Sequence, residues 1–303
     1  MKETLKEKIK QPEFTAPLLV LVVFLAMQVA VKAVNNLEEG NIFIALGIVQ
    51  LLAIGLPCIA YYLLKGRRLE EPLSVIPKRG PQLLFLLFAA VFFITGSLLI
   101  KFFYFVYDID ASATVNIYNT VFAENSAIRH LEVILSLIII PAVCEEILFR
   151  GILFSEYRKH GTANAIVISA LCFSMFHFSA TEFPVYLFAG LLFGFTAAVT
   201  RSVIPSVALH LLSNTLNIYG SDACLRNTVN TNGTYFVGFL LIMVAALAFI
   251  LLLSRVETVC HSYAEKPPVE AIPPKSIQGF GKVFLSPSFL LLVVAFLVIT
   301  FLV

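Results

Sequence analysis

Residues 138–150 read Ile-Ile-Ile-Pro-Ala-Val-Cys-Glu-Glu-Ile-Leu-Phe-Arg, and this stretch decides how the chain is interpreted. It places Glu145, Glu146 and Arg150 within one of the most apolar segments of the sequence. A charged side chain at the centre of a membrane helix costs roughly 2.5–3.5 kcal/mol on insertion scales. Three such groups within six residues therefore indicate that they have partners or a function inside the membrane.

The composition of the whole chain places it in a lipid bilayer. Hydrophobic residues make up 59% of the 303 residues and charged residues 13%, whereas a soluble domain carries about 25% charged residues. Apolar stretches of about 17 residues or more recur, and each is long enough to cross a bilayer. The net charge of +2 gives no indication of a nucleic-acid partner, and the five cysteines suggest no disulfide framework.

The apolar stretches predict an all-α fold, a polytopic bundle of eight or nine transmembrane helices. The expected spans are residues 15–34, 42–64, 81–100, 131–157, 165–180, 184–200, 203–219, 235–254 and 285–303. Residues 1–303 are interpreted as a single membrane domain. Residues 256–283 contain two Pro-Pro pairs and are expected to form an inner linker to the final helix.

The distribution of charge predicts the orientation. With the N-terminus inside, sixteen of the 21 Lys and Arg residues fall on the inner side, four fall on the outer side, and Arg150 lies within a helix. This is a strong positive-inside bias, so we expect a cytoplasmic N-terminus. The short loops favour a bacterial plasma (inner) membrane, with the endoplasmic reticulum membrane as the alternative.

The fourth expected span carries the two adjacent carboxylates. Glu146 and Arg150 are four residues apart, so they share a helix face and are expected to form an ion pair. Glu145 is rotated by about 100° from Glu146 and is expected to face a cavity. Pro141 removes one backbone hydrogen bond, which predicts an irregular helix next to this cavity.

Two later spans carry polar residues at the same helical spacing. Phe173 and His177 share one face of the fifth span, and His210 and Asn214 share one face of the seventh. At about 1.5 Å per residue from the inner helix ends, Glu145 lies ~20 Å deep and His177 ~18 Å deep. The same measure puts His210 at ~12 Å and Asn214 at ~18 Å. We therefore expect the polar groups of the three helices to meet.

These residue types can hydrolyse an amide bond without a Ser or Cys nucleophile. A carboxylate in an apolar pocket can act as a general base, and a neighbouring imidazole can help to orient and deprotonate a water. A second His and an amide side chain can donate hydrogen bonds to an oxyanion. Glu145, His177 and His210 also resemble a zinc site with two His ligands and one carboxylate. The residue pattern leaves both mechanisms open.

The sequence resembles a known protein family at these three positions. The patterns Glu145-Glu146-x-x-x-Arg150, Phe173-x-x-x-His177 and His210-x-x-x-Asn214 are similar to the three motifs of the CAAX protease and bacteriocin-processing (CPBP) family. The members of this family are multi-pass intramembrane proteases related to the CAAX prenyl endopeptidases. The resemblance covers about residues 131–219, which it marks as the catalytic core.

The resemblance implies a role for each motif residue. Glu145 would activate a water, with His177 beside it. His210 and Asn214 would stabilise the oxyanion. The supporting or substrate-binding residues would be Glu146, Arg150 and Phe173.

The resemblance also bears on cofactors and partners. We expect no cofactor, and zinc held by Glu145, His177 and His210 is the alternative. The expected partners are membrane lipid and a membrane-associated peptide or protein substrate, with lipidated substrates included in that class. No nucleic-acid partner is expected.

Two other functions are compatible with buried polar groups. A proton- or ion-coupled transporter would use them as a pathway, but such carriers usually have repeated halves with broken helices, and the sequence shows no such repeat. The second alternative function is that of a catalytically inactive scaffold that binds a partner helix. In that case the ion pair would lock two helices, and the His210/Asn214 pair would join helices at about 0.6 kcal/mol per bond.

Overall fold

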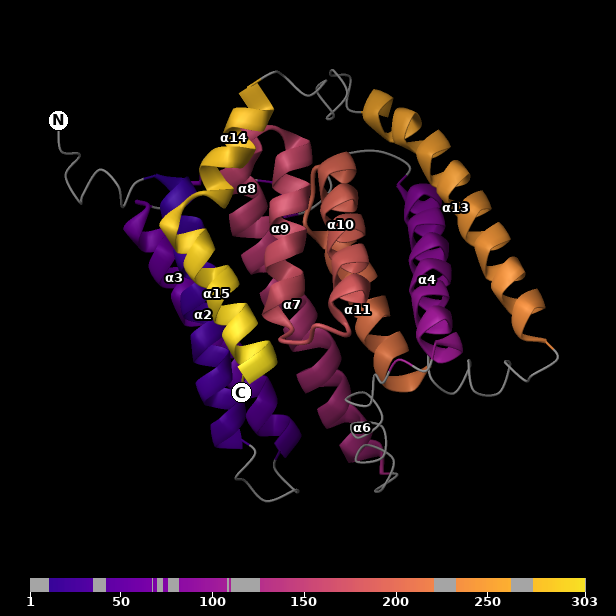
Figure 1. The fold of residues 1–303 in the computed structure, drawn as a ribbon, viewed down its shortest axis with the longest axis horizontal. Coiled ribbons are helices and arrows are strands. Elements are labelled where there is room, and N and C mark those ends of the chain that lie inside the picture. Colours follow the sequence, from indigo (N-terminus) through magenta and orange to yellow (C-terminus); the bar gives the residue numbers. More distant parts are fainter. Residues whose placement is uncertain are drawn as a thin grey trace.

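The computed structural model describes residues 11–34, 42–66, 68–69, 73–75, 82–107, 109, 126–220, 233–262 and 275–302. Every regular element in these ranges is a helix, so the predicted all-α class is confirmed. Figure 1 shows the longer helices running side by side as a bundle, with α13 tilted along one edge.

Five helices in the described part of the chain are long and apolar enough to cross a membrane. They are α2 (Pro12–Val34), α3 (Ile42–Leu64), α4 (Leu83–Val106), α10 (Phe183–Thr200) and α13 (Thr234–Ser262). Two shorter apolar helices accompany them, α9 (Thr162–Phe176) and α15 (Pro287–Leu302). The remaining long helix, α11 (Ile204–Tyr219), packs between α10 and the irregular helical run that carries Glu145 and Glu146.

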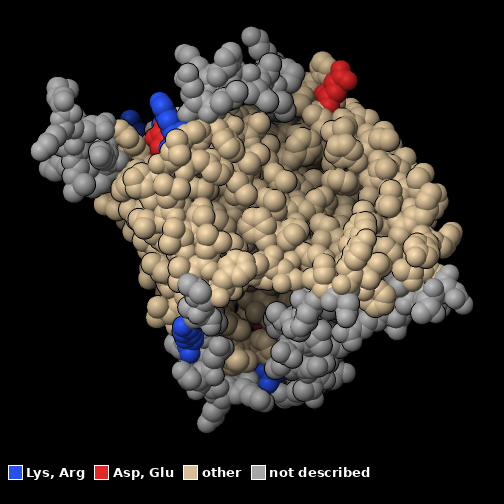
Figure 2. All heavy atoms as spheres, viewed as in Figure 1, with Lys and Arg blue, Asp and Glu red and all other residues tan. Residues whose placement is uncertain are grey.

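The outward faces of the bundle are apolar. Large hydrophobic side chains such as Leu64, Leu83 and Phe236 are exposed at 83%, 79% and 69%. In Figure 2 the described Lys, Arg, Asp and Glu residues that are visible lie near the upper and lower edges, and the band between them is uncharged. Such a surface is stable against lipid rather than water. The chain is therefore a multi-pass membrane protein.

The stretch at residues 138–150 lies in a continuous helical run of irregular geometry. Its segments are α6 (Ala127–Val133), π-helix η2 (Ile134–Ile139), α7 (Ile140–Glu146), π-helix η3 (Ile147–Leu153), α8 (Phe154–Tyr157) and the 3₁₀ turn η4 (Arg158–His160). Pro141, which lacks a backbone N–H, stands at the start of α7, directly after η2. The predicted irregularity thus takes the form of two π-helical segments around the carboxylates, and such segments are frequent at functional sites.

Several boundaries differ from the sequence-based expectation. Helix α4 continues to Val106 rather than ending at residue 100, because the apolar run continues past Lys101 without a proline. Helix α9 ends at Phe176, so His177 caps the helix instead of lying inside it, and Phe178 turns the chain with a φ of 55°. The interval 256–283, expected to be a linker, is helical at both ends. Its proline pairs lie outside the described residues.

The two ends of interval 256–283 explain how the last helix attaches. Helix α13 reaches Ser262, and a short helix, α14 (Lys275–Phe284), leads directly into α15. Phe289, Leu292 and Phe296 of α15 are buried in the main hydrophobic core, where α15 packs against α2. The final helix is therefore part of the bundle.

Close packing of α9 and α10 fixes the walls of the site. A Cβ added at Gly190 of α10 would lie 3.0 Å from the Cα of Ala170 in α9, so the two backbones approach to near contact. Glycine permits this approach because it lacks a side chain. Phe173 on α9 and Phe193 on α10 are thereby brought within 6.0 Å of each other between ring centroids.

Candidate active site

Three of the predicted residues meet around one buried carboxylate oxygen. Glu145 Oε2 lies 3.8 Å from Nε2 of His177 and 3.8 Å from Nε2 of His210. The Glu145 residue is 5% exposed, and its Oε2 has no hydrogen-bond partner among the described residues. Helix α7, the end of α9 and helix α11 therefore each bring one group to the same point, although the residue count placed His210 about 8 Å shallower than Glu145.

The spacing of these atoms leaves each of them open to a small ligand. A separation of 3.8 Å between oxygen and nitrogen exceeds the range of a direct hydrogen bond, which is about 2.7–3.2 Å. One water molecule can approach both Glu145 Oε2 and an imidazole Nε2 across such a gap. A buried carboxylate oxygen without a partner is costly, so this gap favours a bound water or substrate atom.

The predicted ion pair between Glu146 and Arg150 is confirmed. Arg150 Nη1 donates to Glu146 Oε1 at 2.8 Å, and Nη2 donates to the carbonyl oxygen of Gly190 at 2.8 Å. Both charged side chains are fully buried. Of the two roles left open for them, supporting the site or engaging a substrate, this burial favours support.

Glu146 also orients His210. Its Oε1 lies 2.9 Å from His210 Nδ1, and an ionised carboxylate accepts hydrogen bonds but cannot donate them. Nδ1 therefore carries the hydrogen and donates it to Glu146. This bond turns the opposite nitrogen of the ring, Nε2, towards Glu145.

His177, at the end of α9, is also oriented by a hydrogen bond from its Nδ1. Its Nδ1 lies 2.9 Å from the carbonyl oxygen of Phe173, to which it donates. The ring stacks on Tyr186 with a centroid distance of 3.7 Å and an interplanar angle of 18°. In the neutral imidazole this arrangement leaves a lone pair on Nε2, directed at Glu145.

Aromatic rings enclose the buried charges. Phe173, which is 1% exposed, meets the His210 ring edge-on, with 5.4 Å between ring centroids. Phe193 stacks on the His210 ring with a centroid distance of 5.1 Å. The Arg150 guanidinium lies 5.0 Å from the Phe173 ring centroid and 5.5 Å from that of Phe193. Phe173 thus supports both His210 and Arg150 by packing.

Asn214 lies one turn beyond His210 on α11, and its side chain also reaches the irregular run. Its Nδ2 donates to the carbonyl oxygen of Ile138 at 3.3 Å. Ile138 lies in π-helix η2, next to the break at Pro141. An amide nitrogen carries two N–H groups, so this bond uses one and leaves the second for a ligand.

Sequence reasoning missed the contribution of α10. Gly190 accepts from Arg150, while Tyr186 and Phe193 stack on the two histidines. These three residues lie at i, i+4 and i+7 and therefore share one helix face. That spacing, in the helix that follows the Phe173-x-x-x-His177 motif, is the signal that could have identified them.

The zinc alternative would need Glu145, His177 and His210 to surround one ion. Among the residues that the structure describes, no group of three His, Cys, Asp or Glu side chains is placed to hold a metal ion. Tetrahedral zinc with bonds of about 2.0–2.2 Å brings neighbouring donors to roughly 3.3–3.6 Å from each other. The distances from Glu145 to both histidines, 3.8 Å, exceed this range. The three donors therefore stand slightly wider apart than zinc ligands do, and the metal-independent reaction is a proposal.

Comparison with known proteins supports the resemblance seen in the motifs. Residues 128–216 match a family model described as type II CAAX prenyl endopeptidase Rce1-like. The match confirms the predicted resemblance and supports assignment of the chain to the CPBP/CAAX protease family. It contains all seven predicted site residues and covers under a third of the chain. No curated protein and no solved structure matches the chain.

Proposed function

We propose that the protein is an intramembrane endopeptidase that uses a water activated by Glu145 and His177. The observation that carries this proposal is that Glu145 Oε2 has no hydrogen-bond partner among the described residues and lies 3.8 Å from both histidine Nε2 atoms. The family implies a protease, and this geometry supplies the groups for one that needs no covalent intermediate.

The first step is attack by water. One O–H of a water donates to Glu145 Oε2 and the other donates to the lone pair of His177 Nε2, which leaves an oxygen lone pair free. Glu145 takes the first proton as the water oxygen attacks the carbonyl carbon of the scissile peptide bond. The carbonyl π electrons move to its oxygen, and a tetrahedral oxyanion results.

The oxyanion is stabilised by His210 Nε2–H and Asn214 Nδ2–H. Because His210 Nδ1 already donates to Glu146, a donating Nε2 makes the ring an imidazolium. The charges then balance, because the two carboxylates Glu145 and Glu146 face two cations, Arg150 and His210. A buried cluster of zero net charge is far less costly than one with a net charge.

The tetrahedral intermediate collapses by breaking its C–N bond. Glu145 returns the proton it holds to the leaving nitrogen, and the carbonyl re-forms. The products are a new carboxyl terminus and a new amine terminus, and Glu145 regains its starting protonation state. Three residues hold His210 in position. Glu146 accepts its Nδ1–H, Arg150 pairs with Glu146, and Phe173 packs against its ring.

The expected substrate is a peptide or protein associated with the membrane, lipidated ones included, because the reacting groups lie inside a lipid-facing bundle. The short loops favour a bacterial inner membrane, with the endoplasmic reticulum membrane as the alternative. The charge bias favours a cytoplasmic N-terminus.

Peptide mass spectrometry of membranes tests this proposal. Cells that express the protein should contain new peptide termini that are lost in cells expressing Glu145→Gln. Glu132→Gln is the matched control, because Glu132 lies on the same helical run, is paired with Arg129 and stands away from the site. Identical peptide termini with the wild type and Glu145→Gln would refute the proposed function.

A further inference from the structure

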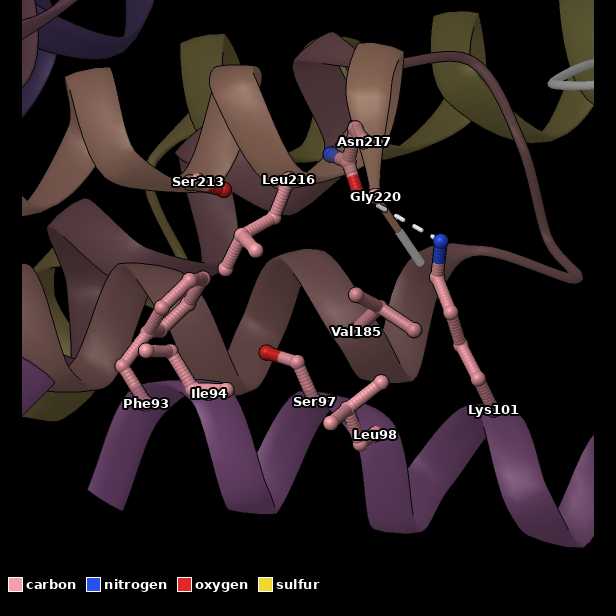
Figure 3. Close-up of a pocket in the computed structure, with 10 residues that line it drawn as sticks. All are labelled: Phe93, Ile94, Ser97, Leu98, Lys101, Val185, Ser213, Leu216, Asn217 and Gly220. Atoms are coloured by element: carbon pink, nitrogen blue, oxygen red, sulfur yellow. Dashed lines mark hydrogen bonds between the residues drawn. The ribbon is translucent and has the colours of Figure 1, made fainter. Parts of the chain in front are cut away.

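A cavity separate from the Glu145 oxygen lies between α4, the beginning of α10 and the second half of α11 (Figure 3). Its volume is about 170 Å³. Its lining is mostly apolar, with hydroxyl, amide and ammonium groups contributed by Ser97, Ser213, Asn217 and Lys101. None of these four residues takes part in the proposed chemistry.

The wall that α4 provides is graded from charged to apolar. Phe93, Ser97 and Lys101 lie at i, i+4 and i+8 and share one helix face. At about 1.5 Å per residue, Ser97 lies ~6 Å below Lys101, and Phe93 lies ~12 Å below it. The order along the cavity is therefore a cation near the end of the helix, a hydroxyl one turn deeper and an aromatic ring at the bottom.

Two polar groups of this wall line the cavity. The Oγ of Ser97 is buried, has no hydrogen-bond partner among the described residues, and points into the cavity in Figure 3. The Lys101 ammonium donates to Asn217 Oδ1 at 3.4 Å across the mouth of the cavity. This bond fixes a positive charge where the cavity approaches the membrane interface.

We propose that this cavity binds an anionic glycerolipid. The negative headgroup pairs with Lys101, an ester carbonyl accepts from Ser97 Oγ, and the start of one acyl chain lies against Phe93 and Leu216. The volume suits this part of a lipid, since an apolar cavity of about 150 Å³ already holds benzene. The rest of the chain continues into the surrounding bilayer.

A lipid fits the lining better than a peptide does. Each peptide residue brings one backbone donor and one acceptor that need partners away from water. The deep end of the cavity, formed by Phe93, Ile94 and Leu216, offers no polar side chain to satisfy them. An acyl chain needs none. Basic groups between transmembrane helices are typical sites for anionic lipid headgroups.

The site has a structural consequence for α11. Ser213 and Asn217, which line the cavity, lie three residues after His210 and Asn214 on that helix. A lipid bound there fills the space between α4 and the helix that carries the two groups proposed to stabilise the oxyanion. We therefore expect it to raise the thermal stability of the folded protein.

The experiment measures thermal unfolding of the purified full-length protein in detergent, with phosphatidylglycerol or phosphatidylcholine added. The chain has no Trp, so a thiol-reactive dye reports unfolding through its buried free cysteines. We expect phosphatidylglycerol to raise the midpoint more than phosphatidylcholine, and added salt to reduce that difference. Lys101→Gln should weaken the apparent affinity for phosphatidylglycerol about fivefold. Lys101→Arg should retain it.

Two further variants separate the parts of the site. Ser97→Val should weaken the response to both lipids, because both contain ester carbonyls. Lys32→Gln, which removes a lysine from the last turn of α2, is the matched charge control and should respond as the wild type does. Should Lys101→Gln fold poorly, Ser97→Val and the salt dependence still decide the question.

Three outcomes would overturn the proposal. The first is an equal response of the wild-type protein to the two lipids. The second is a preference for phosphatidylglycerol that survives in Lys101→Gln. The third is a Lys101→Gln variant that loses affinity for a peptide substrate while its lipid response is unchanged, which would assign the cavity to the substrate instead.

Discussion

Replacing Arg150 by Met tests whether the buried charges act as one balanced cluster. Arg150 is fully buried and makes two hydrogen bonds of 2.8 Å, one of them to Glu146. Its loss leaves a buried carboxylate without its cation, and breaking a buried ion pair in this way costs about 3–5 kcal/mol. That is a large part of a typical free energy of unfolding, about 5–15 kcal/mol. The unfolding midpoint should fall on the order of 10 °C.

The double variant Glu146→Gln/Arg150→Met provides the decisive comparison. It removes both charges, so no unpaired ion remains, and the amide oxygen of Gln at position 146 can still accept from His210 Nδ1. We expect it to be more stable than Arg150→Met alone, although catalysis falls because the imidazolium of His210 loses its counter-charge. The unfolding midpoints of both variants are measured with the thiol-reactive dye. A single variant as stable as the wild type, or a double variant less stable than the single one, would refute the charge balance.

Three further predictions concern the reaction itself. Asn214→Ala removes one oxyanion donor, so kcat on a membrane-anchored peptide should fall about 10²–10³-fold; an unchanged kcat would exclude Asn214 from the oxyanion site. Tyr186→Leu removes the ring stacked on His177, and we expect kcat to fall about tenfold or more with little change in KM; wild-type kcat would show that the stacking does not position the imidazole. Dialysis against a metal chelator should leave kcat unchanged, and a loss of activity that added zinc restores would contradict the metal-independent mechanism.

Much of this architecture could be predicted from the sequence because the signals are strong. Long apolar stretches require helices in lipid, and the i, i+4 spacing of Glu146 and Arg150 predicted their ion pair. Counting residues from the inner ends of the helices put Glu145 and His177 at nearly the same depth, but put His210 about 8 Å shallower. The structure places the three together.

Other features depend on packing that sequence spacing does not encode. The π-helical segments around α7 arise where a proline and two buried carboxylates must be accommodated in one run. The bond from Asn214 to the Ile138 carbonyl depends on the exposed carbonyls of that irregular run. The stacking of Tyr186 on His177 depends on the close approach of α9 and α10 at Gly190. Each of these features joins two or more helices, so no single motif predicts it.

The most direct test of the central claim is the kcat of purified Glu145→Gln on a membrane-anchored peptide, measured beside Glu132→Gln. Glutamine retains the size and hydrogen-bonding capacity of the side chain but cannot take a proton from water. We expect kcat to fall at least about 10²–10⁴-fold while the protein stays folded. A folded Glu145→Gln protein that cleaves the peptide at the rate of Glu132→Gln would contradict the assignment of Glu145 as the base.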